Sequence, residues 1–486
     1  MRSVLALICS LTATITHTAC FGAEDRIPAF PTAEGFGAYA KGGRGGRIIY
    51  VTNLKDFSPE EAVIPGSLRA ACIAKGPRII VFRISGTVEL KAPLAIFEPY
   101  CTIAGQTAPG DGLCIRGDAV KIGARAKPTH DIVVRHMRFR CGPGRRKGHS
   151  PDTLAINNCR DVIIDHCSVT WGVDECLSIT AHPTGFKNNG CVKVKEFTGE
   201  PAVTKNVTVQ WCVVAEGLNR STHNKGAHSK GLMVAYGPSS ISLHHNLIAH
   251  NVDRNPYLPA ECESPFILDV RNNLVYNWKV NTAVAYRKIN HKDRMNFVGN
   301  RYLPGPNSRK KPCLTLSVKT RVFLNDNLGP VRTKATDPEN KAMKGIGRVV
   351  AEAFDLPPVT THPANELASA LLPKVGATLP RRDSADARLV QEVTDRKGTI
   401  IDHPKQVGGW PELKSGEPPA DTDLDGMPDA WEKTHGFDPN DETDGNKDAD
   451  EDGYHNVEEY LNATNPRKTE TIGQQPAQRD AAERAR

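Results

Sequence analysis

A repeated phrase places the strongest constraint on how this chain can fold. Two copies lie between Ile241 and Trp278, ISLHHNLIAHN and LDVRNNLVYN, and they put Asn246 and Asn273 27 residues apart. Between the copies, residues 253–256 (Asp-Arg-Asn-Pro) form a charged, turn-prone insertion that separates two apolar alternating runs. We therefore expect the repeat to build a regular scaffold and the insertion, which contains Arg254, to be a loop that leaves it.

Related phrases recur upstream, from about residue 130, and each ends at a matching position. These positions are Met137, Cys167, Cys212, Asn246 and Asn273, separated by 30, 45, 34 and 27 residues, and Asn300 continues the series. One structural unit repeated with insertions is typical of a solenoid. Because the units are short alternating strands, the pattern predicts an all-β parallel β-helix, in which the last three asparagines would stack as an internal amide ladder. A β-sandwich is the alternative, but it would need no such repeat.

The segments before and after the repeats fit the same scheme. Apolar alternation predicts early strands at residues 47–51, 78–84, 101–103 and 113–115. A helix is expected at residues 66–74, capping one end. After Pro304 the pattern weakens, and we expect a tail with a helix near residues 365–372 that folds back over the solenoid and caps it. A disordered linker is the alternative for this tail.

The N-terminus has the order of a secretory signal. Arg2 precedes an apolar run that is too short to span a bilayer, and small residues follow as far as Ala23. Cys20 raises the alternative of a lipid anchor. No other apolar run reaches about 18 residues, so we expect a secreted, extracellular protein without a membrane span, with the periplasm or the cell surface as alternatives. Several of the thirteen cysteines fall at predicted strand positions, which predicts mostly buried thiols, with one or two disulfide bridges as an alternative.

Charge divides the chain into a basic body and an acidic C-terminal module. Residues 421–466 carry 15 acidic residues and 2 lysines, a net charge of −13, so the remaining residues carry +20 when the whole chain carries +7. A basic body suits a polyanion, which could be nucleic acid, a membrane surface or an acidic polysaccharide.

Composition also suggests where the domains begin and end. The expected segments are a signal peptide at 1–23, a β-helix domain at 24–412, a linker at 413–420, a calcium-binding module at 421–466 and a disordered tail at 467–486.

Two twelve-residue stretches of the acidic module match the calcium-binding loop of an EF-hand. The first places oxygen ligands at Asp421, Asp423, Asp425, Asp429 and Glu432. The second places them at Asp448, Asp450, Asp452, Asn456 and Glu459. Each loop has glycine at its sixth position, which a solvated acidic run would not explain, so we expect a small EF-hand-like module that binds structural calcium. The segment resembles the calcium repeats of dockerins and thrombospondin type 3 modules, but it lacks the near-duplicate helices of a dockerin, which argues against cohesin docking.

Polar stretches of the solenoid precede Arg254. They read His149-Ser-Pro-Asp152, DHCSVTWGVDECLS from Asp165 to Ser178, and His228-Ser-Lys230-Gly. In this order, followed by RNP and NNLVYNW, they resemble the pectate lyases of polysaccharide lyase family 1, over about residues 30–410. The resemblance implies a right-handed parallel β-helix that cleaves polygalacturonate by β-elimination with calcium at the site.

The resemblance also implies a role for each matching residue. Asp152 and Asp174 would bind calcium, Lys230 would hold a substrate carboxylate next to Pro256, and Arg254 would remove the C5 proton. Arginine is an unusual base because its reference pKa is about 12.5 or higher. Nearby calcium and Lys230 would disfavour its charged form, so an alkaline optimum is expected.

Two positions depart from the family pattern. Ser178 stands where many members carry a third calcium carboxylate, and Glu175 is the candidate substitute. Pro259 stands where the R-x-P-x-x-R motif ends in arginine. We expect Asp165 and His166 to be structural rather than catalytic, because alternation points them towards the strand core or its edge.

Other functions remain open on the residues alone. A β-helix glycoside hydrolase would need two carboxylates, which Asp152, Asp174 and Glu175 could supply. A non-catalytic protein that binds polysaccharide or mediates adhesion would need only the solenoid, the calcium module and the basic body. The resemblance implies an acidic polysaccharide as partner and no nucleic acid. Capped solenoid ends predict a monomer, and the C-terminal module is a candidate for contact with a cell surface or another protein.

Overall fold

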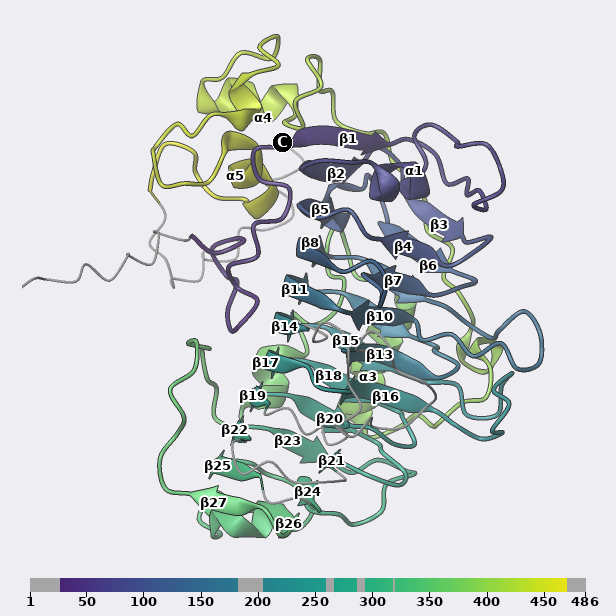
Figure 1. Ribbon diagram of the computed structural model, residues 1–486, viewed down its shortest axis with the longest axis vertical. Helices are drawn as coiled ribbons and strands as arrows, with labels where there is room; N and C mark the ends of the chain where they lie inside the picture. Colours follow the sequence, from purple (N-terminus) through teal and green to yellow (C-terminus); the bar gives the residue numbers. More distant parts are fainter. Residues whose placement is uncertain (1–26, 182–203, 259–265, 286–292, 318–319, 470–486) are drawn as a thin grey trace, which may run out of the picture.

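The chain forms a parallel β-helix. The computed structural model describes residues 27–181, 204–258, 266–285, 293–317 and 320–469, so the predicted signal peptide and Pro259 lie outside the described residues. Short strands stack from β1 (Arg47–Val51) at one end of the long axis to β27 (Arg348–Val350) at the other (Figure 1). Paired strands run parallel and come from successive coils. The predicted solenoid is therefore confirmed.

Three faces build each coil. The first face is an eleven-stranded sheet of β1, β2 (Arg78–Phe82), β5 (Cys101–Ala104), β8 (Thr129–Arg135), β11 (Cys159–Asp165), β14 (Lys205–Gln210), β17 (Ser239–His244), β19 (Ile267–Arg271), β22 (Arg294–Val298), β25 (Arg321–Asn325) and β27. The second face is an eight-stranded sheet of β3 (Gly86–Glu89), β6 (Leu113–Arg116), β9 (Arg138–Arg140), β12 (Ser168–Thr170), β15 (Val213–Ala215), β18 (Leu247–Ala249), β20 (Leu274–Tyr276) and β23 (Arg301–Leu303).

The third face is divided into two sheets. The larger has five strands, β4 (Leu94–Ile96), β7 (Val120–Ile122), β10 (Leu154–Asn157), β13 (Glu175–Thr180) and β16 (Lys230–Ala235). The smaller has three strands, β21 (Ala283–Ala285), β24 (Leu314–Leu316) and β26 (Met343–Gly345). Isolated bridges from Tyr257 to Met233 and to Val284 connect the two sheets, so the insertion after Asn251 fills the gap between them.

The predicted amide ladder is present inside the solenoid and is longer than expected. The side-chain oxygen of Asn273 accepts hydrogen bonds from the backbone N–H and the side-chain amide of Asn246, at 3.2 and 3.0 Å. Asn300 accepts in the same way from Asn273, at 3.0 and 3.1 Å. Asn327 adds a further rung, 2.9 Å from the Asn300 amide nitrogen. Because these buried groups satisfy one another, the ladder sets the register between coils.

The helix predicted near the N-terminus is α1 (Leu68–Ile73), and Ser67 caps it by accepting a hydrogen bond from the backbone N–H of Ala70. Its residues Leu68 and Cys72 belong to the main core, so α1 covers the interior at the β1 end. The described cysteines are all buried with free thiols, which agrees with the expectation of mostly buried thiols. No helix among the described residues is long and apolar enough to cross a membrane.

The tail after the solenoid runs back along its side. Helices α2 (Leu367–Leu371) and α3 (Ser384–Asp395) pack on the outer face of the eight-stranded sheet, where Leu389 contributes to a shared apolar cluster. The buried guanidinium of Arg140 on β9 donates to Asp386 on α3 at 2.7 Å. The predicted tail helix is confirmed as α2, whereas α3 was not predicted. The tail folds back over the solenoid as expected, and it covers the apolar outer face of the eight-stranded sheet.

The acidic module lies at the β1 end of the molecule. Its helices are α4 (Asp429–His435) and α5 (Asn456–Asn462), and both lie beside β1 and β2 in Figure 1. The side chains of Met427 and Val457 share an apolar cluster with Ile79 of β2. After the tail, the chain therefore returns to the β1 end, where the C-terminal module packs against the first strands of the eleven-stranded sheet.

Candidate active site

Polar side chains from successive coils line up at one edge of the five-stranded sheet. Glu175 at the start of β13 is in register with Lys230 at the start of β16, and Lys230 bridges in parallel to Asp253 in the insertion. One coil earlier, the carboxylate of Asp152 accepts a hydrogen bond from the backbone N–H of Glu175 at 3.2 Å. Because stacked coils repeat the same geometry, residues far apart in sequence form one row.

Three carboxylates meet at this edge. Asp152, Asp174 and Glu175 each offer an oxygen within 4.8 Å of the others. Burial, with the charge of Asp174 as the second cause, raises the pKa of Asp152 to about 7. The side chain of Ser178, which replaces a carboxylate of the family pattern, donates to the carboxylate of Asp152 at 2.6 Å. This crowding of negative charge is what a divalent cation would relieve.

Two histidines contact the carboxylate of Asp174. His228 Nε2 lies 2.6 Å from one oxygen of Asp174, and His223 Nε2 lies 3.5 Å from the other. His223 Nδ1 accepts the backbone N–H of Lys225, which leaves Nε2 as the protonated nitrogen that donates to Asp174. Burial acts to raise the pKa of Asp174, but the hydrogen bond from His228 and the positive charge of neighbours such as Arg254 together outweigh burial, and the pKa is lowered. Sequence reasoning assigned no role to these histidines, because no spacing in the chain links them to Asp174.

Arg254 reaches this acidic group from the insertion. Its guanidinium forms an ion pair with the buried carboxylate of Glu175. The same guanidinium lies 3.1 Å from the sulfur of Met233 and 5.5 Å from the ring centre of Tyr257. The side chain retains 25% exposure, so it is supported by the protein and open to a ligand.

Lys230 is held beside Arg254. Its ammonium group lies 3.1 Å from the carboxylate of Asp253, whose other oxygen accepts from the side-chain amide of Asn281 at 3.0 Å. Pro256 is buried, and its carbonyl accepts the backbone N–H of Val284 at 3.0 Å. Pro256 therefore anchors the insertion to β21, which fits a positioning role better than an open binding surface.

The residues at this edge fit a hard cation such as calcium. The three acidic side chains offer only oxygen ligands, which calcium prefers, and they alternate with the positive charges of Lys230 and Arg254. As expected from the sequence, Asp165 is structural, because it is fully buried and its carboxylate pairs with Arg135 at 2.8 Å.

The first predicted calcium loop gathers most, though not all, of its predicted ligands. Oxygens of Asp421, Asp423 and Asp425 lie within 4.8 Å of one another, and Asp425 also groups with Glu432. Burial and the neighbouring acidic groups raise the pKa of Glu432 to about 8. The two oxygens of Asp429 instead accept from the backbone N–H and the hydroxyl of Thr422, both at 2.8 Å.

The second predicted loop has the turn that its glycine predicted. Gly453 takes a φ of +96°, a conformation that favours glycine, and its N–H donates to Asp448 at 2.8 Å. Asp452 accepts the N–H of Tyr454 at 2.9 Å, and the buried side-chain amide of Asn456 donates to the carbonyl of Asp444 at 2.7 Å. Burial, together with Asp452, raises the pKa of Asp450. Glu459 is also buried.

Comparison with known proteins gives a consistent set of relatives. The chain is 32% identical over 448 residues to "Probable pectate lyase C" of Aspergillus flavus, covering 90% of this chain and 94% of that protein. It is 33% identical over 428 residues to "Probable pectate lyase C" of Emericella nidulans, covering 85% of this chain and 87% of that one. No protein-family model matches the chain.

Solved structures of similar overall shape are more distant. A "Pectate lyase bound to hexasaccharide" is 13% identical, with a TM-score of 0.48, over 73% of this chain and 99% of that one. The cedar pollen allergen jun a 1 is 15% identical, with a TM-score of 0.44, over 71% of this chain and 92% of that one.

Proposed function

The chain belongs to the pectate lyase family, and on that premise we propose that it cleaves polygalacturonate or a related uronan by calcium-assisted β-elimination, with Arg254 as the base. The observation that carries the proposal is the meeting of Asp152, Asp174 and Glu175 with Lys230 and Arg254 at one sheet edge. A uronate carries a carboxylate beside the carbon that loses its proton, so its recognition needs positive charge close to the base.

Lys230 and Arg254 supply that positive charge. Both project from the edge where β16 meets the insertion, and both are tethered by carboxylates that a substrate carboxylate could replace. The mature β-helix domain is basic outside the acidic module, which favours the approach of a polyanion.

The proposed elimination breaks a C–H bond and a C–O bond of the uronate and forms one C–C double bond. Arg254 in its neutral form takes the proton from C5 of the uronate. The electron pair of that C–H bond forms the C4–C5 double bond, the glycosidic C4–O bond breaks, and the departing oxygen gains a proton. The negative charge that builds up beside the carboxylate during this step must be stabilised for the step to be fast.

Asp152, Asp174 and Glu175 would hold the calcium ion at this edge. A calcium ion held there would supply positive charge that stabilises the negative charge developing on the uronate. Glu175 then has two possible partners, the ion and Arg254. A cation at Glu175 would release the guanidinium of Arg254 for the substrate.

The rest of the chain is assigned from its sequence and packing. We infer that residues 24–412 form the lyase domain, that residues 413–420 connect it to the calcium-binding module at 421–466, and that residues 1–23 direct secretion. The two loop sequences and the buried acidic side chains of the first loop support the calcium assignment of the module.

Product analysis tests this function. Polygalacturonate is incubated with the protein and calcium, and ultraviolet absorbance of an unsaturated uronate is compared with release of reducing ends. We expect both signals to rise together, because elimination creates one double bond for each chain break. Reducing ends without absorbance would identify a hydrolase, and binding without either signal would identify a non-catalytic protein.

A further inference from the structure

An acidic residue from outside the first predicted calcium loop joins the acidic side chains of that loop. Asp444, which begins the short 3-10 turn Asp444–Asn446 between the two loops, groups with Asp425 and Glu432 within 4.8 Å. Gly445 allows this approach, because a Cβ added there would lie 2.4 Å from the carboxylate of Asp425. The loop pattern alone would have chosen Asp429, whose oxygens are bound to Thr422 instead.

Buried oxygens without partners converge at this place. Glu432 is 0% exposed, and neither of its carboxylate oxygens has a hydrogen-bond partner among the described residues. The other four carboxylates of the group each keep one such oxygen, and they belong to Asp421, Asp423, Asp425 and Asp444. Buried charged groups are rarely left unsatisfied in a folded protein, so this arrangement calls for a cation.

The same loop rests directly on the β-helix. Gly426, at the sixth loop position, packs so closely that a Cβ there would lie 3.1 Å from the side chain of Ile48 on β1. The next residue, Met427, is fully buried and belongs to the apolar cluster with Ile79 and Val81 of β2. The turn at Gly426 and Met427 therefore shapes the loop and also packs against the first coil of the β-helix.

Asp421 contacts both the β-helix and the acidic side chains of the first loop. The hydroxyl of Tyr50 on β1 donates to Asp421 at 2.5 Å, and the guanidinium of Arg83, just after β2, lies 3.8 Å from the same oxygen. The remaining oxygen of Asp421 faces the group of acidic side chains. The position of Asp421 thus depends on the β-helix on one side and on the ligand group on the other.

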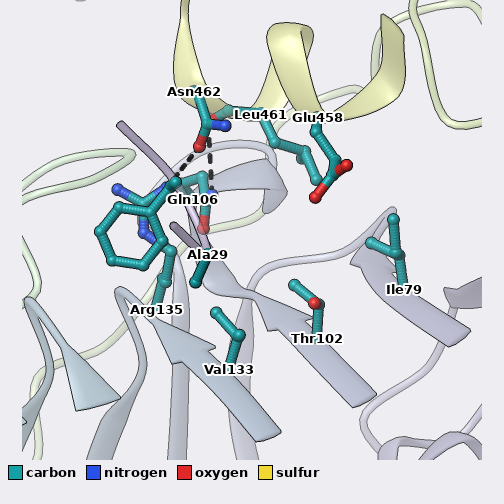
Figure 2. Close-up of a pocket in the computed structure, with 10 residues that line it drawn as sticks. Ala29, Ile79, Thr102, Gln106, Val133, Arg135, Glu458, Leu461 and Asn462 are labelled. Atoms are coloured by element: carbon teal, nitrogen blue, oxygen red, sulfur yellow. Dashed lines mark hydrogen bonds between the residues drawn. The ribbon is translucent and has the colours of Figure 1, made fainter. Parts of the chain in front are cut away.

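Helix α5 forms the second part of the same interface. Glu458 pairs with Arg44 at 2.8 Å, and the side chain of Asn462 accepts from Arg135 on β8 at 2.8 Å. Figure 2 shows α5 above the sheet, with Leu461 and Asn462 lining a small pocket opposite Val133 and Arg135. Because α5 begins within the second predicted loop, an ordered loop would help to hold α5 in this contact.

We propose that Asp421, Asp423, Asp425, Glu432 and Asp444 form a calcium site that fastens the C-terminal module onto β1 and β2 of the lyase domain. Calcium takes six to eight oxygen ligands in flexible geometry, which five carboxylates from two segments can supply. Binding the ion would fix Asp421 and the apex of the loop, and with them the contact to Tyr50 and Ile48. The inference rests on the calcium loops proposed above, but not on the elimination reaction.

Two variants with the same charge change test which acidic residue is the ligand. Calcium binding to the full mature chain is measured by titration calorimetry for the native protein, Asp444→Asn and Asp429→Asn. We expect one binding event to weaken by about tenfold or more in Asp444→Asn, because charged ligands set the affinity of such sites. Asp429→Asn should bind like the native protein. Equal affinity in Asp444→Asn, or an equal loss in Asp429→Asn, would overturn the ligand set.

Hydrogen exchange of the native chain tests the fastening without any variant. Backbone amides of β1 and β2 are compared with calcium and with a chelator. We expect calcium to slow exchange in β1 and β2 as well as in α4, and Asp444→Asn to lose that protection. Calcium binding that protects α4 but leaves β1 and β2 unchanged would refute the fastening, whereas the absence of binding would refute the loops themselves. Lyase activity enters neither measurement, so these failures are separate from a failure of the proposed reaction.

Discussion

The guanidinium of Arg254 is ion-paired with the buried carboxylate of Glu175. The proposed base and a proposed calcium ligand thus neutralise each other in the chain without a cation. Because Glu175 could not serve both partners fully, calcium and Arg254 would compete for its carboxylate. Calcium would then have two effects in the proposed site: it would stabilise charge on the substrate and free the base.

Glu175→Gln tests this double role. We predict that the variant needs about tenfold or more calcium for half-maximal activity, since one charged ligand is lost. Glu216→Gln is the matched control, because Glu216 is also buried and paired with an arginine, Arg388, at 2.8 Å. The measurement is lyase rate against calcium concentration. An unchanged calcium requirement in Glu175→Gln would make Glu175 a structural partner of Arg254 only.

Ser178→Asp tests whether the departure from the family pattern weakens calcium binding. The Ser178 hydroxyl lies 2.6 Å from Asp152, so a carboxylate at this position would join the three acidic side chains. We predict tighter calcium binding, by about tenfold, and lower stability in chelator, because four carboxylates would repel one another. Calorimetry and thermal unfolding with and without calcium check both parts. Weaker calcium binding in Ser178→Asp would show that the serine itself is needed.

Asn273→Leu tests the ladder. The variant leaves the backbone N–H of Asn246 and the carbonyl of Leu243 without their partner in the dry interior. We predict a loss of at least about 3 kcal/mol in the free energy of unfolding, because each buried unsatisfied group costs about 1–3 kcal/mol. Asn340→Leu, at an exposed position, should change it by about 0.5 kcal/mol or less. Denaturant unfolding followed by circular dichroism compares the two, and equal stability would remove the ladder as a source of register.

Buried histidines should make the fold sensitive to acid. Burial lowers the pKa of His244 to about 3 from its ordinary value of 6.5. Between these values the unfolded chain binds a proton that the folded chain excludes, so the free energy of unfolding falls as pH falls, by about 1.4 kcal/mol per pH unit for this group. His244→Gln should therefore reduce the slope of stability against pH between pH 6 and pH 4. An identical slope in the variant would contradict this origin.

The repeat predicted the fold because its physical cause is local. The apolar alternation indicates which side chains point inwards, and the fixed spacing of the asparagines indicates which coils stack on one another. Asn246, Asn273 and Asn300 are stacked as that spacing predicts. Helix α3 was not predicted, and its position depends on buried ion pairs of Asp383 and Asp386 with Arg138 and Arg140, which are distant in the chain.

Residues of the candidate site could be predicted only where they belong to a recognisable sequence motif. Arg254, Lys230, Asp152 and Asp174 sit in recognisable phrases, and the structure brings them to one edge. The histidines on Asp174 and the approach of Asp444 to Asp425 depend on how loops cross one another. Such contacts have no periodicity, so they cannot be predicted from residue spacing in the sequence.

The proposed reaction depends on Arg254, which would remove the proton in a calcium-dependent elimination. The test is the initial rate of unsaturated product formation from polygalacturonate, at alkaline pH and saturating calcium, for the native protein and Arg254→Ala, with substrate binding measured for both. We predict that Arg254→Ala binds substrate yet loses at least about a hundredfold in rate, as expected when a positioned base is removed. A chelator should abolish the native rate. If Arg254→Ala forms unsaturated product at the native rate, Arg254 is not the base.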